Sequence, residues 1–573
     1  MGSRAIGSAV VRHSSVARGR LAARIGLSLA LLCRTTIALA APASGAETAQ
    51  VQGLPSGAID HSASSTPARE RVAATDGAVS PPTETEMTEV IEPEAASAPS
   101  PAARSASAAD DAAAPAYRFS GWAYQGFGSL FDWQQDSPAY LAVPRDVAFS
   151  HTQAQLRFSY ALGRKFEAVA SGSLLYSWTY SPNDTERQTV AQHGAHGAYE
   201  MRLQELYAGV FWTGLDLRIG QQRVAWGRAE ALAPNDVLNA RDLRDPFPTE
   251  RNLFHQPTPL VRADVALGDK SSLQLIFAPI FVPDKIDIYG SNWALIQPGA
   301  PDSLRGFFHQ MGSLVDASLL NEFNRLTQQS ALPPSGVTQF AAGTRAATTL
   351  SGIDLATYYY YGYDRTPRLK VDPAFAQLLQ SVDFSMIRAG DFAPLFNAIQ
   401  AGQAPIALTY ERNHHLGADF GTTLGPLGLT FDLAYDTNRG FFLRDLTGYG
   451  ARTGELVAAL EYQTGDIHKV LVLESSVLHL FEQAPPPLLF VQQTTATFAL
   501  LARAPLLSSL DVELRARFSP TPNNVVARLM LEWRVNDRFA LRAYGTWTAG
   551  DQWGLGGYFE HNSGAELGAK VNL

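Results

Sequence analysis

The sequence predicts an all-β protein: a closed antiparallel transmembrane β-barrel of roughly 16 strands (14 to 18), with helical segments in long extracellular loops. Three observations lead to this prediction. The chain begins with an export signal, its aromatic residues start abruptly at Tyr117, and apolar and polar residues alternate from there to the C-terminus. All 29 Phe, 20 Tyr and 9 Trp residues lie from Tyr117 onwards.

Residues 1–40 have the layout of a secretory signal peptide, because arginines without any acid precede a short apolar run at 25–32. Ala38 and Ala40 offer a cleavage site, and residues 44–46 offer a second one. An uncleaved anchor is the alternative, but Arg34 interrupts the run well short of the roughly 20 residues of a spanning helix. The only cysteine, Cys33, lies in this segment, so we expect no disulfide and no thiolate chemistry in the mature chain.

Residues 41–116 are rich in Ala, Pro, Ser, Thr and Glu and contain no aromatic residue, which predicts a disordered periplasmic linker. The acidic stretch at 84–94 favours an extended tether that could bind a periplasmic partner. The chain has a formal charge of −9, and removal of the six arginines of residues 1–40 leaves −15. Such an acidic chain is a poor candidate for binding nucleic acid.

Residues 117–573 form the predicted barrel domain. In 525–535 apolar residues occupy every second position, and in 539–547 the pattern repeats after a tight turn, which indicates a hairpin. One hairpin suits a sandwich as well as a barrel, so the prediction depends on how often the pattern recurs. No apolar segment of about 18 residues occurs, which excludes a helical membrane protein. The other expected strands are 118–130, 149–161, 166–180, 205–213, 215–226, 260–267, 273–281, 349–361, 406–422, 427–435, 455–464, 469–480, 494–502, 510–518 and 564–573.

The connections and strand ends also favour a barrel in the outer membrane of a Gram-negative cell. Tight links alternate with long ones, and aromatic residues such as Trp212, Trp226 and Trp547 recur at strand ends, as in interfacial girdles. The expected partners are therefore outer-membrane lipid, lipopolysaccharide and the barrel-assembly machinery, although the chain ends on Leu573 rather than the usual Phe. Helical spacing at 302–326 and 372–400 predicts helices in the two longest loops, as a lid, a constriction or simple loop packing.

The densest motif follows the strand expected at 215–226. It combines acids and arginines in a set that could pair with itself, as a structural network, or line a permeant-binding constriction. A calcium site is a third hypothesis, but the usual glycine-punctuated spacing is missing. A second cationic and aromatic region surrounds residues 358–363, beside Arg368. The candidate lumen residues are Arg223, Trp226, Arg228, Asp236, Asn239, Arg241, Asp242, Arg244, Asp245, Arg345 and Arg365.

The segments G-x-Q-x-V-x-W-G at 220–227 and P-x-D-V-L-N-x-R-D at 234–242 resemble a proteobacterial outer-membrane barrel family of the uncharacterised DUF1302-like kind. The resemblance covers about the first third of the barrel. It implies a porin-like barrel and a link to traffic in lipids or hydrophobic compounds, and it brings no catalytic residues.

No enzymatic motif supports catalysis, cofactor binding or a metal site. No serine lies in a G-x-S-x-G elbow, and His414 and His415 are strand neighbours that point to opposite faces. We therefore expect a non-enzymatic, porin-like barrel for passage of a small solute or a hydrophobic, lipid-like molecule. An outer-membrane anchor that partners an envelope complex is the second hypothesis, and an outer-membrane hydrolase is the third.

Overall fold

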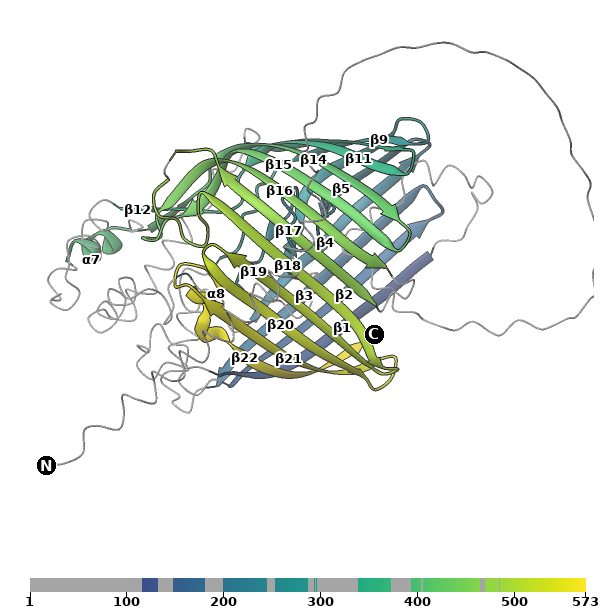
Figure 1. Ribbon diagram of the computed structural model, residues 1–573. Coiled ribbons are helices and arrows are strands. Elements are labelled where there is room, and N and C mark those ends of the chain that lie inside the picture. The colour runs from purple at the N-terminus through teal and green to yellow at the C-terminus, as the bar shows by residue number, and fades with distance from the viewer. Residues whose placement is uncertain are drawn as a thin grey trace, which may run out of the picture. The chain divides into compact units, whose positions relative to one another are not determined.

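The computed structural model describes residues 116–131, 148–180, 199–244, 253–286, 293, 295, 339–372, 393–402, 406–463, 469–483 and 485–573. Within these ranges, 18 strands form one continuous antiparallel sheet (Figure 1). The strands are β1 (Ala116–Leu130), β2 (Ala148–Leu162), β3 (Phe166–Tyr180), β4 (Tyr199–Trp212), β5 (Leu215–Gln222), β8 (Thr258–Ala266), β9 (Ser271–Ala278), β10 (Ala341–Leu350), β11 (Ile353–Tyr363), β14 (Arg412–Leu424), β15 (Leu427–Phe442), β16 (Gly448–Gln463), β17 (Val470–Leu480), β18 (Thr494–Leu507), β19 (Leu510–Pro520), β20 (Asn523–Arg534), β21 (Phe539–Gly550) and β22 (Gly564–Asn572).

The sheet closes on itself. Each strand pairs with its neighbours in chain order, and β22 pairs back onto β1 from Trp122↔Asn572 to Leu130↔Gly564. Closure leaves the sheet without a free edge, so its backbone N–H and C=O groups are satisfied within the wall. The predicted closed barrel is therefore confirmed, at the upper limit of the predicted strand number.

The two ends of the barrel differ. At one end the strands join through tight turns, such as 213–214, 351–352 and 425–426, where Gly214, Gly352 and Gly425 adopt positive φ. At the other end the connections include the long segments 279–340 and 364–411. This is the predicted alternation of short and long connections.

A few smaller elements lie in the connections. Two short antiparallel pairs occur, β6 (Ala240–Arg241) with β7 (His255–Gln256) and β12 (Arg368–Val371) with β13 (Ile406–Thr409). The helices are α7 (Ala393–Gln400), α8 (Leu555–Tyr558) and the 3-10 helix η4 (Glu560–Asn562). Within the described ranges, no helix combines the length and the apolar character needed to cross a membrane.

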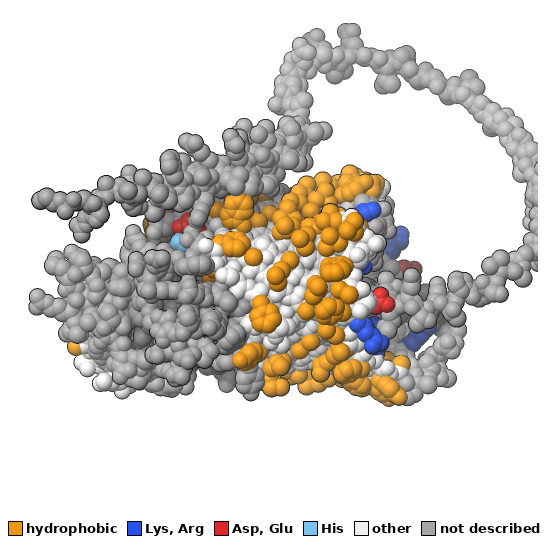
Figure 2. All heavy atoms as spheres, turned by 90° about the horizontal axis from the view of Figure 1, so that it is seen from below, with side chains coloured by type: hydrophobic (Ala, Val, Ile, Leu, Met, Phe, Trp, Pro, Cys, Tyr) orange, Lys and Arg blue, Asp and Glu red, His pale blue; other side chains and the backbone are white. Residues whose placement is uncertain are grey.

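Inward and outward side chains alternate along the wall. On β17, Val472, Glu474 and Ser476 are buried inside the barrel, whereas Leu473 and Val477 are exposed on the outer face. Figure 2 shows hydrophobic side chains spread over the outer wall, with Lys and Arg side chains gathered toward one edge. The wall therefore has an apolar outer surface and a largely polar inner surface, as the alternation in the sequence predicts.

Several predicted boundaries were wrong. Strand β10 was not predicted, because its inward and outward positions are mostly Ala, Gly and Thr and show no hydrophobic alternation. The segment expected as one strand at 406–422 is divided into β13 and β14. The strand expected at 215–226 ends at Gln222, because the chain turns away from the wall there. Helix α7 lies within the helical segment predicted at 372–400, whereas 302–326 and residues 1–115 lie outside the described residues.

Candidate functional site

Residues 223–244, here called the lumenal segment, run inside the barrel from the end of β5 and include β6, the first strand of the short pair β6–β7. Backbone N–H groups of this segment donate to two carboxylates on the far wall. Asp432 of β15 accepts from Arg228 N at 2.9 Å and Ala229 N at 3.1 Å. Glu474 of β17, eight strands further round the 18-strand sheet than β5, accepts from the next three N–H groups at 2.6 to 3.2 Å. The segment therefore crosses the interior from one wall to nearly the opposite one.

Apolar side chains anchor the beginning of the lumenal segment to the wall from which it leaves. Trp226 is 2% exposed, donates from Nε1 to Gln274 Oε1 at 2.7 Å, and packs against the Tyr358 ring at 5.2 Å between centroids. Val224 and Leu238 belong to the same buried cluster. The prediction that Trp226 forms part of an interfacial girdle was wrong, because the indole lies inside the barrel.

Local hydrogen bonds and one glycine shape the segment. The Asn239 side chain accepts from Val224 N at 3.1 Å and donates to Val224 O at 2.9 Å, which ties the two ends of the loop together. Gly227 has a φ of +89°, and a Cβ there would contact Asp432 Oδ2 at 2.6 Å. Only glycine fits this turn without displacing the carboxylate that holds the loop.

Arg228 and Asn235 connect the segment to β11 and β14. The Arg228 guanidinium pairs with Asp419 at 2.6 Å, and Tyr358 donates a hydrogen bond to the same carboxylate. Asn235 Oδ1 lies 3.2 Å from Nε2 of the fully buried His415, whose Nδ1 lies 2.9 Å from Asp436. As predicted, His414 and His415 occupy opposite faces, because His414 is exposed.

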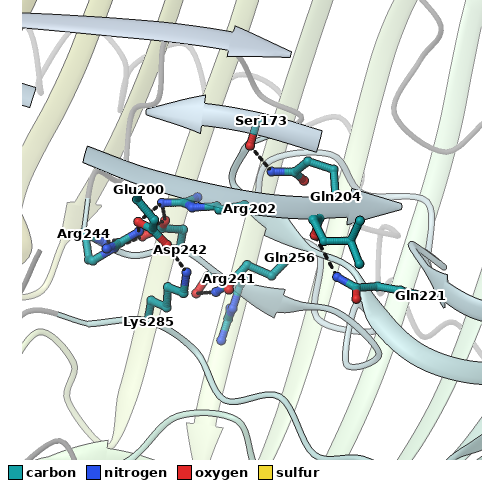
Figure 3. Close-up of polar contacts among 11 residues, drawn as sticks. Ser173, Glu200, Arg202, Gln204, Gln221, Arg241, Asp242, Arg244, Gln256 and Lys285 are labelled. Carbon is teal, nitrogen blue, oxygen red and sulfur yellow. Dashed lines mark hydrogen bonds and ion pairs between the residues drawn. The ribbon is translucent and has the colours of Figure 1, made fainter. Parts of the chain in front are cut away.

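A charged cluster holds the second half of the segment (Figure 3). Asp242 pairs with Arg244 in a bidentate geometry at 2.6 and 2.7 Å and with Arg202 at 2.7 Å. Glu200 pairs with Arg202 and Arg244, both at 2.9 Å, and with Lys285 at 2.6 Å. Three cations thus surround two carboxylates, and the ion pairs extend from the segment to β4 and to the chain after β9.

The electrostatics of this cluster favour the ionised carboxylates and disfavour the charge of Lys285. Burial opposes ionisation of Asp242, but the hydrogen bonds and charges of Arg244 and Arg202 hold the pKa of its carboxyl below the ordinary value. Burial lowers the pKa of the Lys285 ammonium, and the positive charges of Arg202 and Arg244 act in the same direction. The carboxylates therefore need these cations to remain buried and ionised.

Asp236 and Arg241 of the motif also have partners. Asp236 lies 2.9 Å from His255 Nε2, and Asn239 donates to it at 3.2 Å. Arg241 pairs with Asp284, which also accepts from Arg241 N at 2.7 Å. No group of three or more His, Cys, Asp or Glu side chains arranged for a metal occurs in the described part of the chain.

Around Arg241, Arg439 and Arg517, solvent inside the barrel contacts cations more than anions. The side chain of Arg241 is 37% exposed while that of its partner Asp284 is fully buried, and for Arg439 and Glu455 the fractions are 31% and 12%. Arg517, on the same face of β19 as the buried Asp511 and Glu513, is exposed. The carboxylates thus lie behind the guanidinium groups, close to the wall.

The sequence as a whole matches one family model, described as a protein of unknown function (DUF1302), over residues 145–564. The chain belongs to this family. The resemblance expected from the motifs at 220–227 and 234–242 is therefore confirmed, and it extends over most of the barrel.

Solved structures of other barrels are similar to this DUF1302 member at low sequence identity. Three of them are Acinetobacter baumannii OccAB1, Pseudomonas aeruginosa OccK5 (OpdH) and Salmonella typhi OmpF in complex with daunomycin. Each is 9% identical in sequence, and each match covers 80% of this chain. The matches cover 96%, 98% and 97% of those chains, with TM-scores of 0.42, 0.40 and 0.35 respectively. No curated protein matches the sequence.

The structure brings most of the predicted site residues of this DUF1302 member into the barrel interior. Arg223 donates to His255 O at 3.1 Å, and Arg345 lies over the Tyr358 ring at 5.8 Å. Arg365 was expected to line the lumen, but its side chain is buried. It donates hydrogen bonds to Val237 O and Leu238 O and so holds the lumenal segment in place. Asp245 lies outside the described residues.

The predicted charge network is present in a different form. Among the described residues of the motif, only Asp242 and Arg244 form an ion pair with each other, whereas Arg228 and Arg241 pair with Asp419 and Asp284 elsewhere in the chain. Sequence analysis did not identify the wall partners of the motif. The one feature of the sequence that indicates these partners is the presence of charged residues at the inward positions of otherwise apolar strands. The partners missed are Glu200, Arg202, Asp284, Asp419, Asp432 and Glu474. The half-buried Arg439 and the exposed Arg517 were also missed.

Proposed function

We propose that this DUF1302 member is a porin-like channel of the Gram-negative outer membrane, through which a small solute crosses the bilayer. The observation that carries the proposal is the contrast between the two faces of one closed wall. Leucines and aromatic rings are exposed outside, whereas ion pairs line the inside and solvent reaches Arg241, Arg439 and Arg517. A wall of this kind suits lipid on one side and a hydrated path on the other.

The lumenal segment narrows this path. It is bonded to β15 and β17 at its first half and to β4 at its second, so it partitions the interior rather than lying along one wall. Side chains on both sides of the partition are charged, and a solute that passes between them exchanges water for polar contacts. The segment is therefore the constriction of the proposed channel.

Export and insertion complete the proposal. Residues 1–40 direct the chain across the inner membrane, and residues 41–116 remain in the periplasm as a tether with room for a partner. The barrel-assembly machinery inserts residues 117–573, whose outer surface then contacts lipid and lipopolysaccharide.

Single-channel recording of the full-length protein in a planar bilayer tests the proposal. We expect discrete current steps that are absent when heat-denatured protein is added at the same concentration. A bilayer that stays silent while folded barrels are present by heat-modifiable electrophoresis would reject the channel. That outcome would favour a non-transporting anchor that acts through residues 41–116.

A further inference from the structure

We propose that the solutes are small anions and that Arg517, together with Arg241 and Arg439, forms the anion-binding site of the lumen. This inference rests on the proposed channel and specifies its substrate class. The three arginines come from three separate parts of the fold: Arg241 from the lumenal segment, Arg439 from β15 and Arg517 from β19.

The three guanidinium groups share one region of the interior. Strand pairing places Arg517 level with Ala499 of β18 and, one strand further, with Glu474 of β17. Glu474 holds the lumenal segment, which carries Arg241, and Ser476 of the same strand donates to Glu455, the partner of Arg439. At these positions Arg517 interacts electrostatically with both other arginines. Repulsion between these like charges destabilises the arrangement, and the nearby carboxylates Glu455, Glu474 and Asp284 reduce the repulsion. An anion bound between the arginines would offset the repulsion that remains.

Arg517 is the least compensated of the three. Among the described residues it has no hydrogen bond or ion pair within contact distance, although it is exposed to the interior. Arg241 and Arg439 each direct one terminal nitrogen to a carboxylate, Asp284 and Glu455, and keep about a third of the side chain open to solvent. Each guanidinium has five N–H donors, so all three retain donors for a ligand.

The carboxylates of this region are not available to a solute. Glu474 is 4% exposed and is held by three backbone N–H groups of the lumenal segment. Asp284 is fully buried, and Glu455 accepts from Ser476 as well as from Arg439. A permeating molecule therefore meets guanidinium groups first, even though the region also holds negative charge.

The same order of exposure recurs elsewhere on the inner wall. The cation is the more exposed partner in the pairs Arg157 with Glu205, at 38% and 11%, and Arg534 with Asp511, at 35% and 0%. The order is reversed in the cluster around Asp242, where Glu200 is 27% exposed and its partners Arg202 and Arg244 are 9% and 10% exposed. Exposed positive charge is therefore a property of the region around Arg241, Arg439 and Arg517 and not of the whole interior, and it occurs in a chain with a net charge of −9. Carboxylates and phosphates are the anions that the planar fork of arginine binds in bidentate geometry.

Ion selectivity of the full-length protein tests the inference. In a neutral phosphatidylcholine bilayer under a KCl gradient, we expect chloride to be more permeant than potassium. Arg517→Gln should lower that permeability ratio about tenfold. Removing one charge about 6 Å from the permeating ion in a water-like dielectric disfavours chloride about threefold and favours potassium about threefold. Arg452→Gln is the matched control, because Arg452 lies on the outward face of β16 and is 57% exposed beside Glu482. Arg517→Lys should retain most of the selectivity.

Citrate binding to the detergent-solubilised protein provides the second measurement, by titration calorimetry. Binding that Arg517→Gln weakens at least fivefold would support the anion site even if the bilayer stayed silent, and the channel alone would then be rejected. Cation-selective current, or a selectivity that Arg517→Gln leaves unchanged, would overturn the anion site while the channel stands. Silence together with no citrate binding would overturn both.

Discussion

Substitution of Glu474 by Gln should free the lumenal segment from the far wall. One carboxylate oxygen accepts from Glu230 N at 2.6 Å and the other from Leu232 N at 2.7 Å, with Ala231 N shared between them. Glutamine keeps one acceptor and turns an NH2 group toward an N–H donor. Hydrogen bonds to a charged group contribute about 1.5 to 3 kcal/mol each, so loss of one bond and weakening of the others costs about 3 kcal/mol. That shifts the balance between seated and released segment by about a hundredfold.

Single-channel recording detects this shift as a new state of higher conductance, and limited proteolysis detects it as cleavage within residues 223–244. Glu513→Gln is the matched control, since Glu513 also faces inward but pairs with Arg515 on its own strand. If Glu474→Gln showed the conductance states and the protease resistance of the unaltered protein, the carboxylate would not be what seats the segment.

Three further predictions concern stability. Because the pKa of Asp242 is held below its ordinary value, the stabilising effect of its carboxylate should be complete above about pH 5 and decline as the pH falls below about 4. Asp242→Asn should remove this acid dependence from the free energy of unfolding. An unchanged pH profile would contradict the ion-paired state of Asp242. Trp226→Ala should cost about 3 to 5 kcal/mol through the lost indole and its bond to Gln274, measured by denaturant unfolding in vesicles, and a loss below 1 kcal/mol would mean that the site collapses around the cavity. Leu433 is 54% exposed on the outer face, so Leu433→Arg should destabilise the barrel by about 2 to 4 kcal/mol in a bilayer near its midplane, and equal stability of both proteins in vesicles would argue against lipid contact there.

The barrel could be predicted from the sequence because the two faces of its wall have different surroundings, apolar outside and polar inside. Alternation survives wherever the outward side chains are large and apolar, as on β17 and β20. It fails on β10, where small residues occupy both faces and only Arg345 indicates an inward position. It misleads after Gln222, because Val224 and Trp226 continue the alternation but are buried against the inner wall rather than exposed on the outer one. Apolar periodicity indicates that one face of a segment has an apolar environment, but it does not indicate whether that environment lies inside or outside the barrel wall.

The site was predicted in part. The motif located the lumenal segment correctly, since its density of Asp, Asn, Arg and Gly requires partners that an ordinary loop does not need. Its partners could not be identified, because Asp432 and Glu474 lie more than 200 residues further along the chain and look like any other inward acid of a barrel strand. Which guanidinium groups remain open to solvent depends on the packing around them. For that reason Arg517 was not distinguished from the other lumenal arginines.

The span of those hydrogen bonds has a consequence for biogenesis. The lumenal segment follows β5, yet its acceptors on β15 and β17 lie about 200 residues further along the chain, so the segment stays unseated until those strands are in place. During that interval its buried tryptophan and its unpaired arginines are exposed to whatever holds the nascent sheet. Contacts this distant in sequence form slowly. Seating of the segment is therefore a late event, and a barrel that closed without it would be complete in its wall but open in its interior.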